Sequence, residues 1–172
     1  MTFDHAFWQQ HWASPTTAEV NPHLVHETAG LARGTALDAG CGAGAEAAWL
    51  SAQGWATTGV DIAGNALAAA ADPGVEWIEA DLTTWHPGRL FDLVTTHYAH
   101  ASIPQLDLYA RLGEWVAPGG TLLVVGHAGD PAAIVARFPG WQVVTAEVRE
   151  RVLGGHPLRD VVVRLRRPAL AS

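Results

Sequence analysis

Short runs rich in β-forming residues alternate along the chain with alanine-rich helical segments, and this alternation constrains the fold more than any other feature. Strands alternating with helices form parallel βαβ units, in which helices cover both faces of an open sheet. Strands are expected at residues 35–38, 57–61, 75–79, 91–96, 121–125, 141–148 and 160–165. Helices are expected at residues 22–32, 45–53, 64–71, 102–116 and 131–138.

The ends of several expected elements carry their own signals. Asn21 and Asp130 each precede a proline, which predicts an N-cap side chain followed by proline at the first helical position. Ser102 and Gln105 have the spacing of a capping box. Turn residues 153–157 separate the last two strands without a helix, which predicts an antiparallel pair at one edge of the sheet.

Length and composition narrow the class of protein. A chain of 172 residues predicts a single domain, with an N-terminal segment 1–34 that holds a flexible start and one helix, and an α/β core 35–172. The net charge is −7 and every basic residue is an arginine; these are mostly scattered, so neither nucleic acid nor an anionic membrane surface is an expected partner. The first twenty residues show no signal peptide, and the single cysteine, Cys41, fits a reducing cytoplasm. Either a monomer or a homodimer is compatible with these features.

The strongest local signal is the stretch LDAGCGAGAEA, residues 37–47. A strand ends at Asp38, the glycines Gly40, Gly42 and Gly44 follow at alternate positions, and a helix begins. Glycines allow the backbone to approach a ligand closely, and the following helix start offers free N–H groups. This turn predicts a site for a nucleotide-like ligand or a carboxylate.

The glycine turn alone leaves the ligand open, because it also satisfies the dinucleotide fingerprint. Asp61, which lies 21 residues beyond Gly40, is placed to hydrogen-bond ribose hydroxyls in either case. Three features argue against NAD. Asp38 would repel a pyrophosphate but attract a sulfonium and an ammonium. Asp81 and Leu82 follow the third strand and are suited to an adenine, and the chain has no room for a second catalytic domain.

The blocks LDAGCGAG, TTGVDI, IEADLTTW, FDLVTTHY and VAPGGTLLVVG, taken in order, resemble the class I S-adenosylmethionine-dependent methyltransferases over residues 35–126. Residues 7–25 and the tail DVVVRLRRP are similar to small members of the thiopurine and tellurite-resistance types. The resemblance implies a Rossmann-like sheet of order 3-2-1-4-5-7-6 with strand 7 antiparallel. It also implies a cofactor site, whose members are Asp38, Gly40, Cys41, Gly42, Gly44, Asp61, Ile62, Asp81, Leu82 and Thr96.

The loop after the fourth strand is expected to face the transferred methyl group, because ligands of open sheets bind at strand carboxyl ends. His97 and Tyr98 are therefore the candidate catalytic residues, with His97 as a base if its pKa is unperturbed. Trp8, His11 and Trp12 are candidates for a lid over the acceptor pocket, or else anchor the N-terminus. No metal site is expected, because no carboxylate or cysteine motif accompanies the histidines.

The sequence thus predicts an enzyme that transfers a methyl group from S-adenosylmethionine to a small-molecule acceptor and releases S-adenosylhomocysteine. The acceptor atom (oxygen, nitrogen, sulfur or selenium) stays open. Three alternatives remain: a protein that binds the cofactor without catalysis, one that uses this fold for another reaction, and an NAD-dependent reductase.

Overall fold

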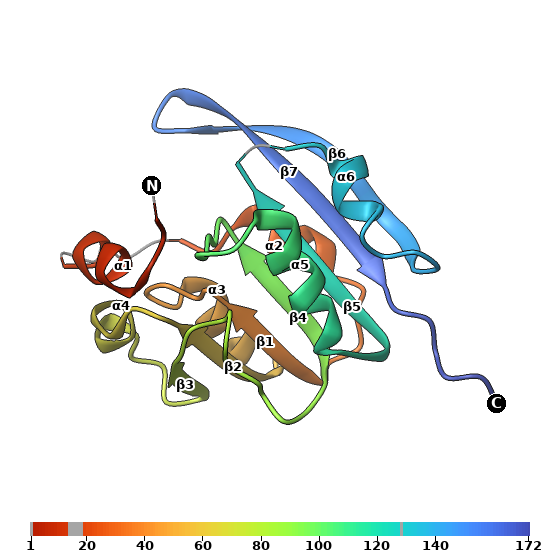
Figure 1. Ribbon diagram of the computed structural model, residues 1–172, viewed down its shortest axis with the longest axis horizontal. Helices are drawn as coiled ribbons and strands as arrows, with labels where there is room; N and C mark the ends of the chain where they lie inside the picture. The colour runs from red at the N-terminus through yellow and green to blue at the C-terminus, as the bar shows by residue number, and fades with distance from the viewer. Residues whose placement is uncertain (1, 14–18, 128) are drawn as a thin grey trace.

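The computed structural model describes residues 2–13, 19–127 and 129–172. Its strands are β1 (Thr35–Ala39), β2 (Ala56–Asp61), β3 (Val75–Glu79), β4 (Phe91–His97), β5 (Val116–Gly126), β6 (Gln142–Leu153) and β7 (His156–Arg166). They form one sheet of order β3-β2-β1-β4-β5-β7-β6 (Figure 1). Strands β1 to β5 pair in parallel, and β7 runs antiparallel to both of its neighbours. The predicted Rossmann-like topology is confirmed.

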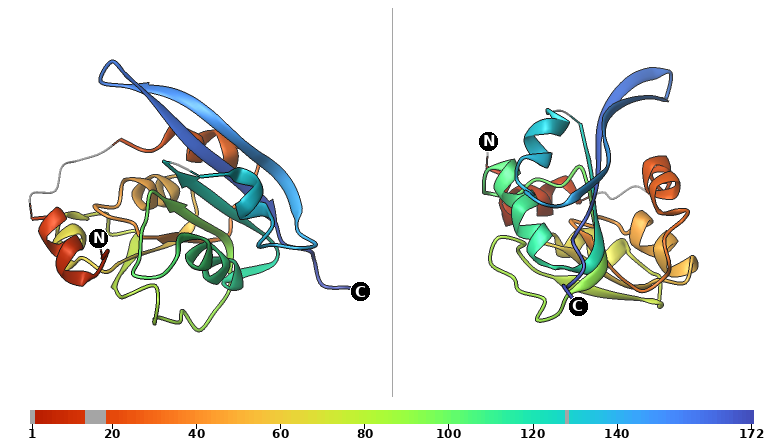
Figure 2. Two further views of the ribbon diagram at one scale, coloured as in Figure 1. Left: turned by 45° about the horizontal axis from the view of Figure 1, so that its top comes forward. Right: turned by 90° about the vertical axis from the view of Figure 1, so that its right-hand side faces the viewer.

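Helices lie on both faces of the sheet, as Figure 2 shows edge-on. The helices of the described residues are α1 (His5–His11), α2 (Pro22–Thr28), α3 (Ala45–Ala52), α4 (Gly64–Ala69), α5 (Gln105–Glu114) and α6 (Pro131–Val135). Leu108 and Leu112 of α5 pack against one face, and Leu24 of α2 with Leu50 of α3 pack against the other. No helix in these ranges is long and apolar enough to span a bilayer.

Two of the three predicted helix starts are confirmed. The side chains of Asn21 and Asp130 each accept a backbone N–H at 2.9 Å, and a proline follows each of them. The predicted Ser102 capping box is wrong: α5 begins only at Gln105, after Pro104. The proline ring disfavours helical backbone at the preceding residue, Ile103, so the helix starts later than expected. The Gln105 side chain instead donates to the carbonyl oxygen of Ala99 at 2.9 Å.

Helix α1 differs from the sequence prediction, which places only a flexible start before the helix at residue 22. The Asp4 side chain caps this helix by accepting the Phe7 N–H at 2.9 Å. Gln9 joins it to α4 through two hydrogen bonds with Asn65, each 2.9 Å long. A helix of seven residues is too short to be stable alone, so these tertiary contacts hold it in place.

The β6–β7 hairpin is longer than predicted and extends past the rest of the sheet (Figures 1 and 2). Pairing continues to Leu153 and His156, next to the turn. Gly154 (φ 58°) and Gly155 (φ 79°) both have left-handed backbone, which is the requirement of a type I′ turn. Two glycines therefore close the hairpin without distorting its strands.

A buried carboxylate fastens this hairpin to α2. Glu27 is 3% exposed and lies 2.8 Å from a guanidinium nitrogen of Arg149 and 3.5 Å from one of Arg164. Thr145 donates its hydroxyl to the same carboxylate at 2.9 Å. Because the carboxylate is removed from water, its ion pairs fix the hairpin more firmly than surface pairs would.

Candidate active site

A cavity of about 730 Å³ opens at the carboxyl ends of β1, β2 and β4. Its volume lies within the range of ordinary ligand pockets, and strand carboxyl ends are where open α/β sheets bind ligands. Two adjoining walls define it, and the Asn21 N–H donates to the Glu46 carboxylate where they meet, at 3.0 Å. The glycine-loop wall is formed by residues 40–46 with Asp61, and the Tyr98 wall is formed by Asn21, His97, Tyr98, His127 and Arg151.

The glycine-loop wall depends on residues that lack a side chain. Gly40, Gly42 and Gly44 all have left-handed backbone, with φ of 74°, 53° and 89°. A Cβ atom on Gly40 would come within 2.5 Å of the Cβ of Ala99. Since real atoms do not approach so closely, only glycine allows the loop to pass this near to the end of β4.

Two aspartates of the cavity are held by backbone and hydroxyl donors. Each oxygen of Asp61 accepts one N–H at 2.8 Å, from Gly42 and from Ala63. One oxygen of Asp81 accepts both the N–H and the hydroxyl of Thr83. The free lone pairs of both carboxylates remain able to accept ligand hydroxyl or amino groups.

Carboxyl groups concentrate around the glycine loop without a cationic partner in the described residues. Burial raises the pKa of Asp38 well above 3.8, and the neighbouring Glu46 and Asp61 raise it further. Burial also raises the pKa of Glu46 and of Asp61. Asp38 is 1% exposed, and its Oδ2 atom has no hydrogen-bond partner among these residues. This wall therefore favours a cationic ligand over an anionic one.

The Tyr98 wall is a network of hydrogen bonds. Tyr98 itself has left-handed backbone (φ 55°), which is unusual for a residue with a large side chain. Its hydroxyl accepts from Asn21 at 3.0 Å and from Arg151 at 2.8 Å, and its ring stacks on His127 with centroids 4.0 Å apart. The strain at Tyr98 is balanced by these contacts, which also fix the direction of its ring.

Arg151 reaches this wall from the β6–β7 hairpin. Its Nε atom donates to Asp160 of β7, whose side chain is completely buried. His23 of α2 lies 3.0 Å from the same carboxylate oxygen. Burial alone would raise the pKa of Asp160, but the hydrogen bonds from Arg151, Tyr98 and His23, together with the Arg151 charge, outweigh burial and lower the pKa. The hairpin and α2 are thus joined beneath Tyr98.

His97 lines the cavity with both ring nitrogens buried and without a hydrogen-bond partner in the described part of the chain. Burial, with a smaller effect from His23, lowers its pKa to about 3. Burial and the nearby Asp160 carboxylate raise the pKa of Tyr98 to about 12. Both side chains are consequently neutral near pH 7, and each can exchange hydrogen bonds with a ligand.

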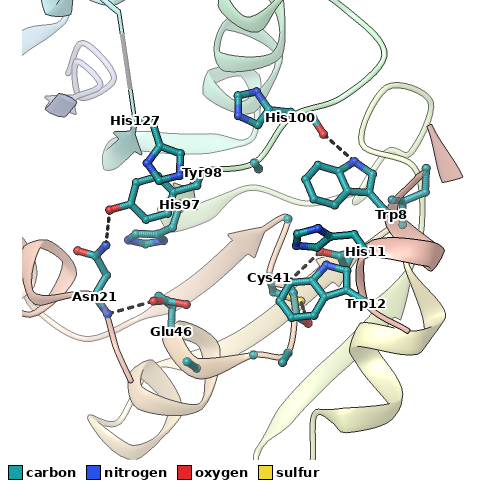
Figure 3. Close-up of a pocket in the computed structure, with 18 of the residues that line it drawn as sticks. Trp8, His11, Trp12, Asn21, Cys41, Glu46, His97, Tyr98, His100 and His127 are labelled. Atoms are coloured by element: carbon teal, nitrogen blue, oxygen red, sulfur yellow. Dashed lines mark hydrogen bonds between the residues drawn. The ribbon is translucent and has the colours of Figure 1, made fainter. Parts of the chain in front are cut away.

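Helix α1 covers the opposite side of the cavity. Figure 3 shows Trp8, His11 and Trp12 across from His97 and Tyr98. The Trp8 indole N–H donates to the carbonyl oxygen of His100 at 3.2 Å. A Cβ atom on Gly42 would lie 2.6 Å from the Trp12 ring, so the indole rests directly on the glycine loop.

A family model described as "Methyltransferase domain" matches residues 36–120, which contain the glycine loop, Asp61, Asp81 and Tyr98. The chain belongs to the class I S-adenosylmethionine-dependent methyltransferases. The cationic ligand that the acidic loop favours is therefore the cofactor, which carries a sulfonium and an ammonium group.

Curated relatives of this methyltransferase include thiocyanate methyltransferase 1 of Arabidopsis thaliana. It is 28% identical over 76% of this chain and 67% of its own length. Trans-aconitate 2-methyltransferase of Escherichia coli (strain 55989 / EAEC) is 31% identical over 73% of this chain. The match covers 53% of that enzyme, so the chain spans about half of its length.

Solved structures share the fold. The N-methyltransferase NodS of Bradyrhizobium japonicum WM9, in complex with S-adenosylhomocysteine, has a TM-score of 0.76 at 18% identity and covers 95% of this chain and 98% of its own. TehB of Haemophilus influenzae has a TM-score of 0.74 at 14% identity, over 93% of this chain and 67% of its own. The methyltransferase therefore has the TehB-like fold that its sequence indicated.

Most of the predicted site residues line the one cavity. These are Trp8, His11, Trp12, Gly40, Cys41, Gly42, Gly44, Asp61, Ile62, Asp81, Leu82, His97 and Tyr98. Asp38 and Thr96 do not line it. Asp38 is buried behind the glycine loop, and the Thr96 hydroxyl donates to the carbonyl oxygen of Ala39 at 2.9 Å within the sheet.

The sequence did not single out Asn21 or Glu46 as site residues, or Arg151. Glu46 follows the last glycine of the motif by two positions, so its place in the first turn of α3 was a usable signal. Asn21 was identified only as a helix cap. Arg151 had no such signal, because its position depends on how far the hairpin extends. The structure also removes the basis for His97 as a base, since its pKa is not the unperturbed one.

Proposed function

We propose that this methyltransferase transfers the methyl group to a small-molecule acceptor that enters the cavity beside the Tyr98 wall. The observation that carries the proposal is that one cavity of about 730 Å³ joins the acidic glycine loop to the His97 ring, which has no hydrogen-bond partner among the described residues. The bound cofactor supplies a methyl group already activated on a sulfonium. The protein then has to hold that donor and an acceptor in contact.

The residues around the glycine loop fit the cofactor in three places. The glycines with Cys41 leave room for its amino-acid part, while Glu46 and the buried Asp38 supply negative charge for its cationic groups. Asp61 beside Ile62 is suited to the ribose hydroxyls. The pair Asp81–Leu82 is suited to the adenine, with one carboxylate oxygen free to accept the exocyclic amino group.

Catalysis in this site rests on orientation. Holding two reactants in reacting geometry lowers a barrier by up to ~7–11 kcal/mol in favourable systems. His97 lines the cavity as a neutral ring, and the direction of the Tyr98 ring is fixed by its hydrogen bonds. We assign both residues to positioning the acceptor. Helix α1, through Trp8 and Trp12, is suited to exclude water.

The relatives support a small acceptor. Two of them are named for thiocyanate and for trans-aconitate, which are both small molecules. In the described residues the cavity is lined by α1, the glycine loop and the hairpin, and its volume of about 730 Å³ suits a small acceptor beside the cofactor.

Calorimetric titration with S-adenosylhomocysteine tests the cofactor site. We expect Asp61→Asn to weaken binding at least tenfold, and Asp107→Asn, on the surface of α5, to leave it unchanged. A transfer assay with radiolabelled S-adenosylmethionine then screens thiols, selenols, phenols, amines and small anions. Tight binding without transfer to any acceptor would favour the non-catalytic alternative, and equal binding by the two variants would contradict the assigned site.

We also infer a cytoplasmic enzyme that works as a monomer or homodimer without nucleic acid. The single cysteine is buried within the glycine loop, and the net charge is −7. Gel filtration and a nucleic-acid shift assay check the last two points.

A further inference from the structure

Arg151 is the only arginine among the cavity-lining residues of the described chain, and the sequence contains no lysine. Its guanidinium uses Nε for Asp160 and one Nη2 hydrogen for Tyr98. The other terminal nitrogen, Nη1, makes no hydrogen bond to the described residues. A guanidinium has five N–H donors, so three remain for a ligand. The side chain is 20% exposed, which leaves it accessible from the cavity.

A second observation in the same wall points to a ligand. His97 is adjacent to Tyr98, which Arg151 contacts, and both of its ring nitrogens are buried without a partner in the described residues. A buried polar group without a hydrogen bond costs free energy, so it marks a place where a bound molecule supplies the missing partner. Arg151 adds to this wall a permanent cation, whose Nε is paired with Asp160 and whose N–H groups beyond those bonded to Asp160 and Tyr98 remain available toward the cavity.

The groups around Arg151 are poorly suited to remove a proton from an acceptor. Tyr98 is protonated and His97 is neutral with a depressed pKa, while burial lowers the pKa of His127, which stacks on Tyr98. Asp160 is occupied by Arg151 and His23. An acceptor that must lose a proton during the reaction finds little help in this wall.

We propose that Arg151 recognises the acceptor and that the acceptor enters the site as an anion. Carboxylates, thiolates and halide-like ions are anions of this kind. This inference rests on the proposed methyl transfer. The anion donates an electron pair to the methyl carbon while the carbon–sulfur bond breaks, and that bonding pair passes to sulfur. One negative and one positive charge cancel, giving a methylated product and neutral S-adenosylhomocysteine without any proton transfer.

The same pairing assists product release. Before transfer, the guanidinium attracts a charged acceptor; after transfer, the product has one negative charge fewer. Its attraction to Arg151 is correspondingly weaker. The arginine therefore distinguishes substrate from product at the atom that reacts.

Calorimetry on the complex with S-adenosylhomocysteine tests this without requiring turnover. The probes are iodide and the matched pair 3-mercaptopropionate and 3-mercaptopropanamide, which differ at neutral pH in one carboxylate charge. We expect the wild type to bind the carboxylate at least ten times more tightly than the amide. Arg151→Gln should weaken binding of the two anions by about ten- to hundredfold, as expected for a hydrogen bond to a charged group, and leave the amide unchanged.

Arg159→Gln is the control. Arg159 lies on β7 of the same hairpin, its side chain is 72% exposed, and it does not line the cavity. We expect it to bind all three probes as the wild type does. Arg151→Lys retains the charge and should recover part of the anion affinity, and it replaces Arg151→Gln if that variant does not fold.

The outcomes distinguish the proposed methyl transfer from the proposed role of Arg151. Failure of the wild type to bind S-adenosylhomocysteine would overturn the proposed function itself. Cofactor binding with equal affinity for the carboxylate and the amide would overturn only the role of Arg151. So would a loss of affinity in Arg151→Gln that is the same for charged and neutral probes.

Discussion

Replacing Gly40 by alanine separates the cost of backbone strain from the cost of a close approach, because the chain provides a matched glycine. Gly40 and Gly119 have nearly the same φ, 74° and 76°. A Cβ atom on Gly40 would lie 2.5 Å from Ala99, whereas one on Gly119 meets no atom within 4 Å. Gly119 lies outside the residues that line the cavity.

The free energies of unfolding of Gly40→Ala and Gly119→Ala should differ only by the cost of the steric overlap with Ala99. Left-handed backbone costs an L-residue roughly 1–2 kcal/mol. Replacing glycine also lowers the conformational entropy of the unfolded chain, which stabilises the folded protein by about 0.4–1 kcal/mol. Gly119→Ala should thus lower the free energy of unfolding by about 1 kcal/mol. Overpacking adds about 1–3 kcal/mol, so Gly40→Ala should lower it by roughly 2–4 kcal/mol.

Urea denaturation followed by tryptophan fluorescence measures both changes, and calorimetry measures the affinity for S-adenosylhomocysteine. Because relief of the overlap with Ala99 displaces the glycine loop, Gly40→Ala should also weaken cofactor binding at least tenfold. Gly119→Ala should not alter binding. Equal destabilisation by the two substitutions, or wild-type cofactor affinity in Gly40→Ala, would refute the explanation of the loop given above.

Three further outcomes are expected. The pKa values of the Asp38, Glu46 and Asp61 carboxyls are raised in the folded protein, so the folded protein retains protons that the unfolded chain has released. The contribution of these groups to the free energy of unfolding therefore decreases as pH rises above 3.8–4.5. Cofactor binding should release protons, which calorimetric titration in buffers of different ionisation enthalpy detects. His97→Asn should lower the transfer rate less than the 10²–10⁴-fold typical of a lost general base, and the wild-type pH–rate profile should show no His97 inflection near pH 6.5, because its pKa is about 3. Glu27→Gln should destabilise the protein by about 3 kcal/mol in urea denaturation, since it breaks a buried ion pair, and a change below 0.5 kcal/mol would show that the hairpin is fastened elsewhere.

The sheet order and the glycine loop could be predicted because their signals are local. A strand that ends at Asp38, three alternating glycines and a helix start lie within eleven residues, and each feature has a separate physical cause. The same holds for the caps at Asn21 and Asp130, which need only one side chain and the following proline.

The remaining features depend on contacts between distant parts of the chain. Helix α1 is held by Asp4 and by the bonds between Gln9 and Asn65, which no periodicity reveals. The low pKa of His97 follows from burial between elements that meet only in the fold. Arg151 reaches Tyr98, 53 residues away, only because the hairpin pairs as far as its two-glycine turn.

The cavity draws its lining from two separable parts of the chain, the β6–β7 hairpin and the parallel half of the sheet, which also carries His97 and Tyr98. Arg151 and Leu153 stand on a terminal hairpin that is tied to α2 by Glu27 and Asp160, whereas the glycine loop belongs to the parallel half of the sheet. Exchange of hairpins between homologues should consequently retarget the enzyme while preserving its methyl-donor specificity. A library confined to residues 148–158 would explore acceptor range without disturbing the half of the molecule that binds the donor.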